Sequence, residues 1–270
     1  MPPSEAASSL RTSFRNRSPM TGPLAYIGGK HRIAKRIIAL FPAHRTFVEP
    51  FAGGAQVLFE KRPSSVEVLN DLDGDVVNFF RTCQRHADEL MRVLKFTLVS
   101  RRWFSLFEAE NPATLTDIER AARFFYLQKT AFAGLVVRRS HNYSVVSKPS
   151  LNLERLPEII ENAHRRLARV HIECLPYEEI IRRFDRAETL FYLDPPYWGR
   201  KLYRHNFTND DFRELARRLA AVKGKFVLSV NDVPELRELF RAHVIREIEF
   251  PYTALRQGGK RFRELLITNF

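Results

Sequence analysis

Four consecutive residues, Asp194–Tyr197 (Asp-Pro-Pro-Tyr), combine a carboxylate, a stiff turn and an aromatic ring directly after the apolar run Thr189–Leu193. Neither proline can donate to a sheet ladder, so the pair predicts that a strand ends here. Open α/β sheets hold their ligands at such carboxyl ends. The Asp194 carboxylate and the Pro195 carbonyl can accept hydrogen bonds from an exocyclic amine, and Tyr197 can stack on a planar base. The segment therefore indicates chemistry on the amino group of a nucleobase, whereas a purely structural Pro-Pro turn is the alternative interpretation.

A glycine-containing loop and a later carboxylate are suited to hold a nucleoside-type cofactor. An expected strand ends at Glu49 and runs into Pro50–Gly54, where glycines let a ligand approach the backbone closely. This loop has neither the G-x-G-x-x-G pattern of dinucleotide sites nor the Lys-Ser/Thr of a phosphate-binding loop. Asp71 ends the next expected strand, about twenty residues later, where a carboxylate commonly accepts ribose hydroxyls. A tight turn and a helix N-cap are the alternatives, although Asp73 or Asp75 could equally supply the cap.

The segment Tyr26–Lys30 (Tyr-Ile-Gly-Gly-Lys) adds an aromatic ring, an open backbone and a positive charge ahead of the first expected helix. By itself it is a loop with a solvated lysine. With the motifs above, in this order, the chain resembles the D12-class, Dam-like DNA adenine-N6 methyltransferases. Their pattern is aromatic-x-Gly-Gly-Lys, Glu-Pro-Phe-x-Gly, an acidic strand end, a target-recognition insert and Asp-Pro-Pro-Tyr. Phe226–Asn231 and Arg263–Asn269 match as well, and the resemblance runs from about residue 23 to the end of the chain. Gly53-Gly54-Ala55, where some members carry Gly-x-Gly, is a mild departure.

The resemblance implies an enzyme that uses S-adenosyl-L-methionine to methylate N6 of an adenine flipped out of double-stranded DNA. The methyl group would pass directly to nitrogen, without a metal or a covalent intermediate. The implied cofactor-binding residues are Tyr26, Lys30, Phe51, Gly53, Asp71 and Asp194, and the implied catalytic residues are Asp194, Pro195, Pro196 and Tyr197. An N4-cytosine methyltransferase would more often carry Ser in place of Asp194, and a non-catalytic DNA-binding protein would be expected to have lost Asp194 or Asp71. An RNA methyltransferase is a further alternative.

Composition favours a polyanionic partner. The 270 residues include 44 Lys and Arg against 31 Asp and Glu, a formal net charge of +13, and cations that meet phosphates release condensed counterions. The two cysteines, Cys83 and Cys174, stand in no metal-type spacing. No apolar run approaches the ~20 residues of a membrane span. We therefore expect a cytoplasmic protein of a bacterial or phage-infected cell, monomeric in solution, that binds DNA and neither metal nor membrane.

Apolar runs that alternate with helical patterns predict a Rossmann-like α/β sheet of about seven strands, mostly parallel, with an antiparallel strand near the C-terminus. The expected strands are Thr46–Glu49, Ser65–Leu69, Val170–Cys174, Thr189–Leu193, Lys225–Val230, Val244–Phe250 and Glu264–Thr268. Residues 23–74 and 165–270 are expected to form the catalytic domain. Residues 75–164 are expected to form an inserted helical target-recognition subdomain, and residues 1–22 a disordered tail.

Within the insert, Val137–Asn152 is basic, polar and without helical periodicity. Arg138 and Arg139 carry bidentate donors that suit a guanine edge, and Asn142 carries an amide that suits adenine. Lys148 is expected to contact a phosphate. A solvated basic loop without base contacts is the alternative for each residue, and none of them indicates which DNA sequence is recognised.

Overall fold

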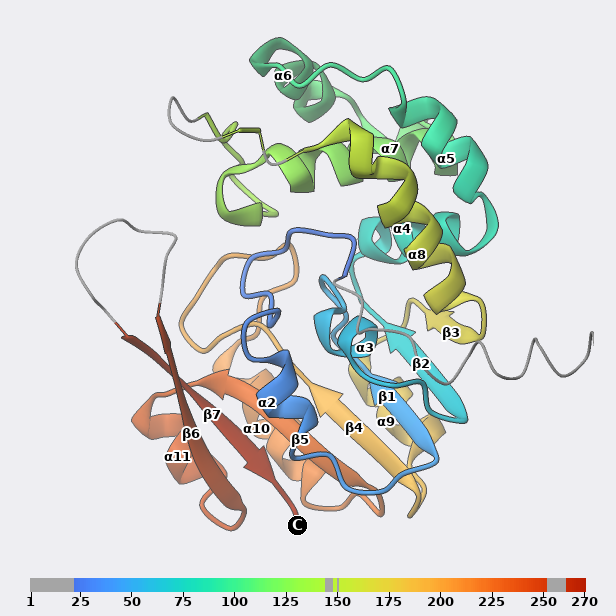
Figure 1. The fold of residues 1–270 in the computed structure, drawn as a ribbon. Coiled ribbons are helices and arrows are strands. Elements are labelled where there is room, and N and C mark those ends of the chain that lie inside the picture. The colour runs from blue at the N-terminus through green and yellow to red at the C-terminus, as the bar shows by residue number, and fades with distance from the viewer. Residues whose placement is uncertain (1–21, 144–147, 150, 252–260) are drawn as a thin grey trace, which may run out of the picture.

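The computed structural model describes residues 22–143, 148–149, 151–251 and 261–270. The expected N-terminal tail lies almost wholly outside the described residues. Figure 1 shows a twisted sheet with helices on both faces, and a second group of helices that lies above the sheet in this view.

The sheet has the strand order β3-β2-β1-β4-β5-β7-β6. Its strands are β1 (Thr46–Glu49), β2 (Val66–Asn70), β3 (Val170–Glu173), β4 (Thr189–Leu193), β5 (Lys225–Asn231), β6 (Val244–Pro251) and β7 (Arg261–Thr268). All pairings are parallel except those of β7, which is antiparallel to both β5 and β6. The predicted α/β class, with a mostly parallel sheet and an antiparallel C-terminal strand, is confirmed. The chain order reverses between β1 and β4, which is where such sheets form their ligand crevice.

Buried apolar runs explain the two central strands. Every residue of β4 is buried, as are Phe47, Val48 and Glu49 of β1, which suits parallel strands covered on both faces. The last strand begins at Arg261 rather than at the predicted Glu264. Because that end of β7 is polar, hydrophobicity alone could not indicate it.

Helices cover both faces of the sheet and create two hydrophobic cores. The helices α9 (Tyr177–Phe184), α10 (Asn209–Leu219) and α11 (Pro234–Leu239) contribute Ile180, Leu215 and Leu236 to one core. On the other face, α2 (Ala34–Ile38) and α3 (Gln56–Glu60) contribute Ile37 and Leu58 to the second core.

Between β2 and β3 the described chain is helical. Its helices are α4 (Gly74–Arg85), α5 (Ala87–Leu94), α6 (Arg101–Ala109), η1 (Pro112–Thr114), α7 (Asp117–Thr130), η2 (Phe132–Gly134), η3 (Leu153–Arg155) and α8 (Leu156–Leu167). These helices share a core with the sheet, since Phe80 of α4 packs on Phe59 of α3 with ring centroids 6.2 Å apart. The domain boundaries at residues 75 and 164 remain predictions.

Candidate active site

A cavity of about 490 Å³ lies at the carboxyl ends of β1, β2 and β4. The residues that line it include all six predicted cofactor-binding residues: Tyr26, Lys30, Phe51, Gly53, Asp71 and Asp194. Of the other predicted catalytic residues, Pro196 lines the cavity, whereas Pro195 and Tyr197 are not among the residues that line it. The topology therefore brings together motifs that are far apart in the sequence.

Two glycines that line the cavity leave no room for a side chain. Gly28 has φ +73°, and an added Cβ would lie 2.8 Å from the hydroxyl oxygen of Tyr203. Gly53 has φ +46°, and its Cβ would lie 3.0 Å from the Tyr26 ring. Any side chain at either position would be strained and would displace an aromatic residue of the site. These glycines therefore allow Tyr26 and Tyr203 to pack closely against the loops that line the cavity.

Asp71 orders the loop that follows β1. Its Oδ2 accepts the Gly53 N–H at 2.8 Å, and its Oδ1 accepts the Asp73 N–H at 2.8 Å. Burial raises the pKa of Asp71 to about 6, although these backbone donors act in the opposite direction. The helix cap belongs to Asp73, which accepts from Asp75 N at 2.9 Å. The N-cap alternative for Asp71 is therefore wrong.

Three aromatic rings gather beside this loop. The centroid of Phe51 lies 5.4 Å from those of Tyr177 and Phe207, which are themselves 5.5 Å apart. The rings come from the loop after β1, the start of α9 and the loop before α10. Together they offer an apolar surface to a planar group. Tyr177 and Phe207 belong to no motif of the sequence, and only the fold brings them here.

Lys30 is the charged centre of the other end of the cavity. Its side chain is only 4% exposed. Its Nζ donates to Asp194 Oδ1 at 2.7 Å, to the Tyr197 hydroxyl at 3.0 Å and to the Gly28 carbonyl at 3.0 Å. Burial opposes the charge, but Asp194 and Glu264 outweigh it and raise the pKa of Lys30 above its usual value. The interpretation of Lys30 as a solvated lysine is wrong.

The Asp194 carboxyl has a pKa that lies above its ordinary value and below neutral pH. Burial raises its pKa to about 6; Lys30 acts to lower the pKa, and Glu264 raises it further. The carboxyl is therefore largely ionised at neutral pH and can accept hydrogen bonds. Glu264 was missed in the sequence as a site residue, and the available signal was a charge directly before the apolar run Leu265–Ile267.

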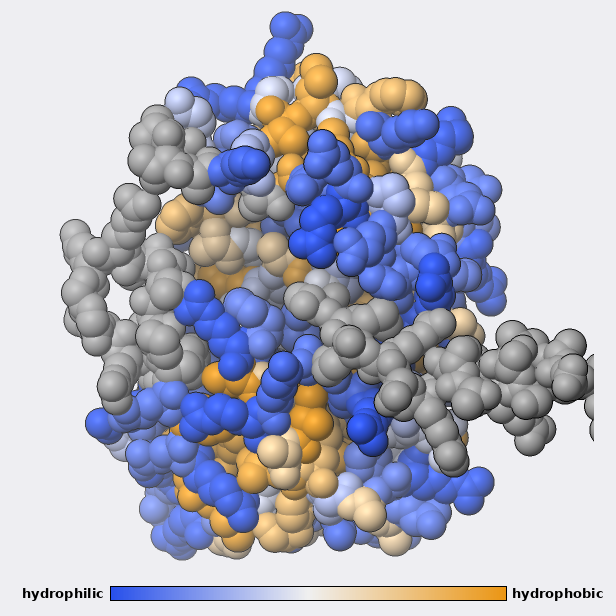
Figure 2. Space-filling view, in the orientation of Figure 1, coloured by the Kyte–Doolittle hydropathy of each residue, from blue (hydrophilic) through white to orange (hydrophobic). Residues whose placement is uncertain are grey.

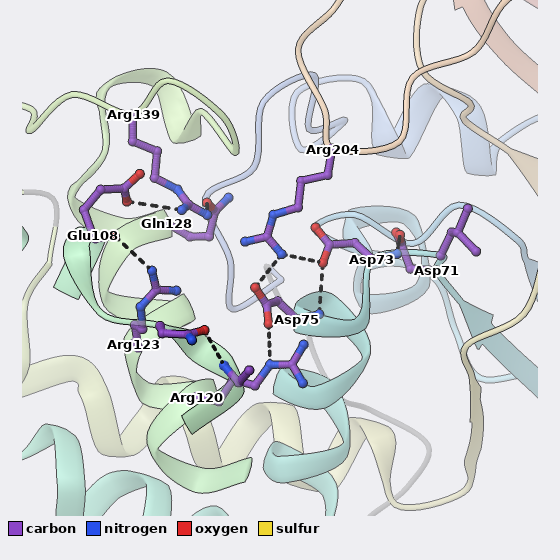
Figure 3. A network of polar contacts seen from close by, with 12 residues as sticks. Asp71, Asp73, Asp75, Glu108, Arg120, Arg123, Gln128, Arg139 and Arg204 are labelled. Atoms are coloured by element: carbon purple, nitrogen blue, oxygen red, sulfur yellow. Dashed lines mark hydrogen bonds and ion pairs between the residues drawn. The ribbon is translucent and has the colours of Figure 1, made fainter. Parts of the chain in front are cut away.

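The loop after Tyr197 closes one side of the cavity. Tyr203 donates to the Ile27 carbonyl at 3.2 Å, and its ring stacks on Tyr26 with centroids 6.2 Å apart. Arg204, on the same loop, donates to Asp73 at 3.0 Å and also pairs with Asp75. Figure 3 shows that Asp75 also receives Arg120 from α7. Ion pairs therefore join this loop, the start of α4 and the helices beyond it.

The predicted DNA-binding residues fall into two groups. Arg138, Asn142 and Lys148 are exposed, and Arg138 has φ +50°. The side chain of Arg139 is only 3% exposed. Its guanidinium donates to the Leu135 carbonyl, to Gln128 and to Glu108 at 3.1, 3.2 and 3.3 Å, as Figure 3 shows for the last two. This geometry gives Arg139 a role within the fold and does not favour it as a reader of bases.

The surface and the side-chain clusters add little further chemistry. The face in Figure 2 is largely hydrophilic, and hydrophobic residues reach it in the lower half and at the top, near α6, whose Trp103 and Leu106 are exposed. Among the described residues, no group of three or more His, Cys, Asp or Glu side chains could hold a metal ion. In the same part of the chain, no helix has both the length and the apolarity to cross a membrane.

Comparison with known proteins supports the motifs. The family model of the D12 class N6 adenine-specific DNA methyltransferases matches residues 26–253. A DNA N-6-adenine-methyltransferase of Escherichia phage P1 is 26% identical over 234 residues, which cover 80% of this chain and 30% of that protein. The type II methyltransferase M1.LlaDCHI of Lactococcus lactis subsp. cremoris is 26% identical over 97% of this chain and 98% of its own length. The type II methyltransferase M.MjaIII of Methanocaldococcus jannaschii is 25% identical, over 92% of this chain and 98% of its own.

Proposed function

The chain belongs to the D12 class of N6 adenine-specific DNA methyltransferases, and we propose that it flips adenine out of double-stranded DNA and directs the methyl group of S-adenosylmethionine onto N6. One observation carries this proposal. The ionised Asp194 carboxylate is held by Lys30 at the end of β4, on the wall of a cavity that also contains Asp71 and a cluster of aromatic rings.

The cavity fits a nucleoside cofactor. The cluster of Phe51, Tyr177 and Phe207 would offer an apolar surface to the adenine ring of the cofactor, and Asp71 would accept the ribose hydroxyls. The loops at Gly28 and Gly53, which also line the cavity, would contact the rest of the molecule. S-adenosylmethionine, when bound, supplies a methyl group on a sulfonium centre that an amine can attack.

The Asp-Pro-Pro-Tyr turn would act on the target base. Asp194 and the Pro195 carbonyl would accept the two N–H bonds of N6, which favours a tetrahedral nitrogen with its lone pair free for attack. Tyr197 would recover part of the stacking that the base loses on flipping, worth ~1–3 kcal/mol per base. Catalysis would then consist of positioning and electrostatics.

Incubation of the purified protein with labelled S-adenosylmethionine and duplex DNA tests this function. Nucleoside analysis should find N6-methyladenine. Label found in N4-methylcytosine instead, or a preference for RNA when RNA and duplex DNA compete, would contradict the proposal.

Arg138, which is exposed in the predicted insert, provides a test of target recognition. If Arg138 reads a guanine edge, Arg138→Ala should relax the choice of site by roughly 1–3 kcal/mol at one base position. Lys148→Ala should instead weaken methylation at all sites alike and reduce its salt dependence, because a phosphate contact carries no sequence information. Sequencing of methylated adenines in DNA treated with each variant measures both effects.

The neighbouring arginine is the matched control. Arg139→Ala removes the same kind of side chain, but it also removes the Arg139 hydrogen bonds to Gln128 and Glu108. It should therefore lower the melting temperature. An unchanged ranking of methylated sites with Arg138→Ala would rule out base reading by Arg138.

A further inference from the structure

A second buried carboxylate, Glu264, lies beside the Asp194–Lys30 pair. Its side chain is only 4% exposed. Its Oε1 accepts the hydroxyl of Tyr197 and lies 3.7 Å from Lys30 Nζ, and its Oε2 accepts from Ser229 Oγ at 3.1 Å. The residue projects from β7, the antiparallel strand, so the C-terminal end of the chain contributes directly to the site. Both carboxylate oxygens are thus committed to partners within the site.

The first consequence concerns the orientation of Tyr197. Its hydroxyl donates to Glu264 and accepts from Lys30 Nζ, which also lies 5.0 Å from the centre of the ring. Two hydrogen bonds at one hydroxyl fix the ring plane more tightly than packing alone. Without Glu264, the tyrosine hydroxyl would keep only Lys30 as a partner among the described residues.

The second consequence is electrostatic. One ammonium, Lys30, is shared by two carboxylates, since it bonds Asp194 and pairs with Glu264. Like charges that share a site raise each other's pKa, and Glu264 does act in this direction on the pKa of Asp194, after burial. The titratable groups that interact with Asp194 lie in the segment before α2, in β1, β4 and β7, and in the loop after β4. They are Lys30, Glu49, Tyr192, Tyr197, Tyr203 and Glu264. Among these carboxylates, Glu264 is the one that also pairs with Lys30.

We propose that Glu264 is a positioning residue for methyl transfer, which fixes the Tyr197 ring and, by sharing Lys30, leaves Asp194 a stronger acceptor for the target amine. The inference rests on the proposed function. Its physical basis is that a carboxylate fully neutralised by one ammonium accepts hydrogen bonds more weakly than a carboxylate that must share it.

The substitution Glu264→Gln separates charge from shape. Glutamine keeps an oxygen for the Tyr197 hydroxyl and a similar volume, but it removes the negative charge. Single-turnover methyl transfer to duplex DNA, followed between about pH 5 and 8, should show an acid limb as Asp194 becomes protonated. Because the loss of a neighbouring negative charge stabilises ionised Asp194, the midpoint of that limb should move to lower pH by roughly one unit. The plateau rate above the limb should fall several-fold, since Asp194 then accepts more weakly.

Saturating S-adenosylmethionine is essential in this measurement, because the pKa of Asp71 is also raised to about 6 and its protonation would otherwise reduce cofactor binding in the same pH range.

Glu247→Gln is the matched control. It removes an equal charge from β6, where Glu247 is exposed and pairs with Arg237, and it should behave as the wild type.

Ser229→Ala is a second variant, which keeps the Glu264 charge but removes one of its hydrogen bonds. Because this hydrogen bond helps to hold the Glu264 carboxylate beside Lys30, its loss should weaken the effect of Glu264 on Asp194, and the acid limb should move in the same direction by a smaller amount. If Glu264→Gln does not fold, as judged by thermal melting, Ser229→Ala decides the question. A folded Glu264→Gln protein with the wild-type acid limb and plateau rate would overturn the inference alone, whereas a wild-type protein that methylates no adenine would overturn the proposed function with it.

Discussion

Replacing Asp194 with alanine is expected to slow methyl transfer by roughly a hundredfold or more, the scale for losing one preorganised electrostatic contact. The carboxylate would hold the amine most strongly as nitrogen becomes tetrahedral, so the loss should fall on the transfer rate rather than on DNA affinity. Rapid-quench, single-turnover measurement with a labelled methyl donor gives that rate directly.

The surroundings of Asp194 make this variant interpretable. Lys30 retains Glu264, Tyr197 and the Gly28 carbonyl as partners, so the buried ammonium is not stranded. Asp194→Asn is the companion variant, because it retains one acceptor oxygen and should lose less activity. Near-normal single-turnover transfer by a folded Asp194→Ala protein would refute the mechanism and the location of the active site.

Replacing Asp71 with alanine is expected to weaken S-adenosylmethionine binding by roughly 1–3 kcal/mol, as for a lost charge-assisted acceptor. Part of this loss should come from the loop after β1, because Asp71 also holds the Gly53 and Asp73 N–H groups. Titration calorimetry with the cofactor measures the effect.

Asp71→Asn is the matched variant for this carboxylate. It keeps an oxygen for one backbone N–H but removes the charge, so its affinity should lie between those of the wild type and Asp71→Ala. Unchanged cofactor affinity in Asp71→Ala would exclude Asp71 from the cofactor site.

Local signals made the strands and the motif positions predictable. The runs that became β1 and β4 are apolar and end in proline-containing turns, so both their type and their ends were encoded within a few residues. Four of the six predicted cofactor-binding residues met at one cavity because parallel strands place their carboxyl ends at a common edge, whereas Tyr26 and Lys30 come from the segment before α2.

Features that depend on tertiary packing were not predictable. Tyr177, Phe207 and Glu264 enter the site from α9, a loop and an antiparallel strand. The two aromatic residues look like ordinary core residues in the sequence, and the charge of Glu264 does not by itself indicate which site it enters. Arg138 and Arg139 are adjacent and chemically identical, yet one is exposed and the other is buried. The difference arises from the left-handed backbone at Arg138 and from acceptors on α6 and α7, which periodicity cannot reveal.

The anchoring of the helical insertion has a consequence for protein engineering. Arg166 of α8 bonds Glu67 of β2 and the Leu58 carbonyl, and α4 begins at the capping residue Asp73 beside the cavity. A chimaera that exchanged the whole insertion would therefore cut through the cofactor pocket and the shared core. Junctions placed after α4 and before α8 would spare the cofactor pocket but not the core, because Phe124 and Phe125 of α7 pack on Phe79 of α4 and Arg120 of α7 pairs with Asp75. An exchange of α5 to α7 would therefore have to keep aromatic side chains at positions 124 and 125 and a cation at position 120.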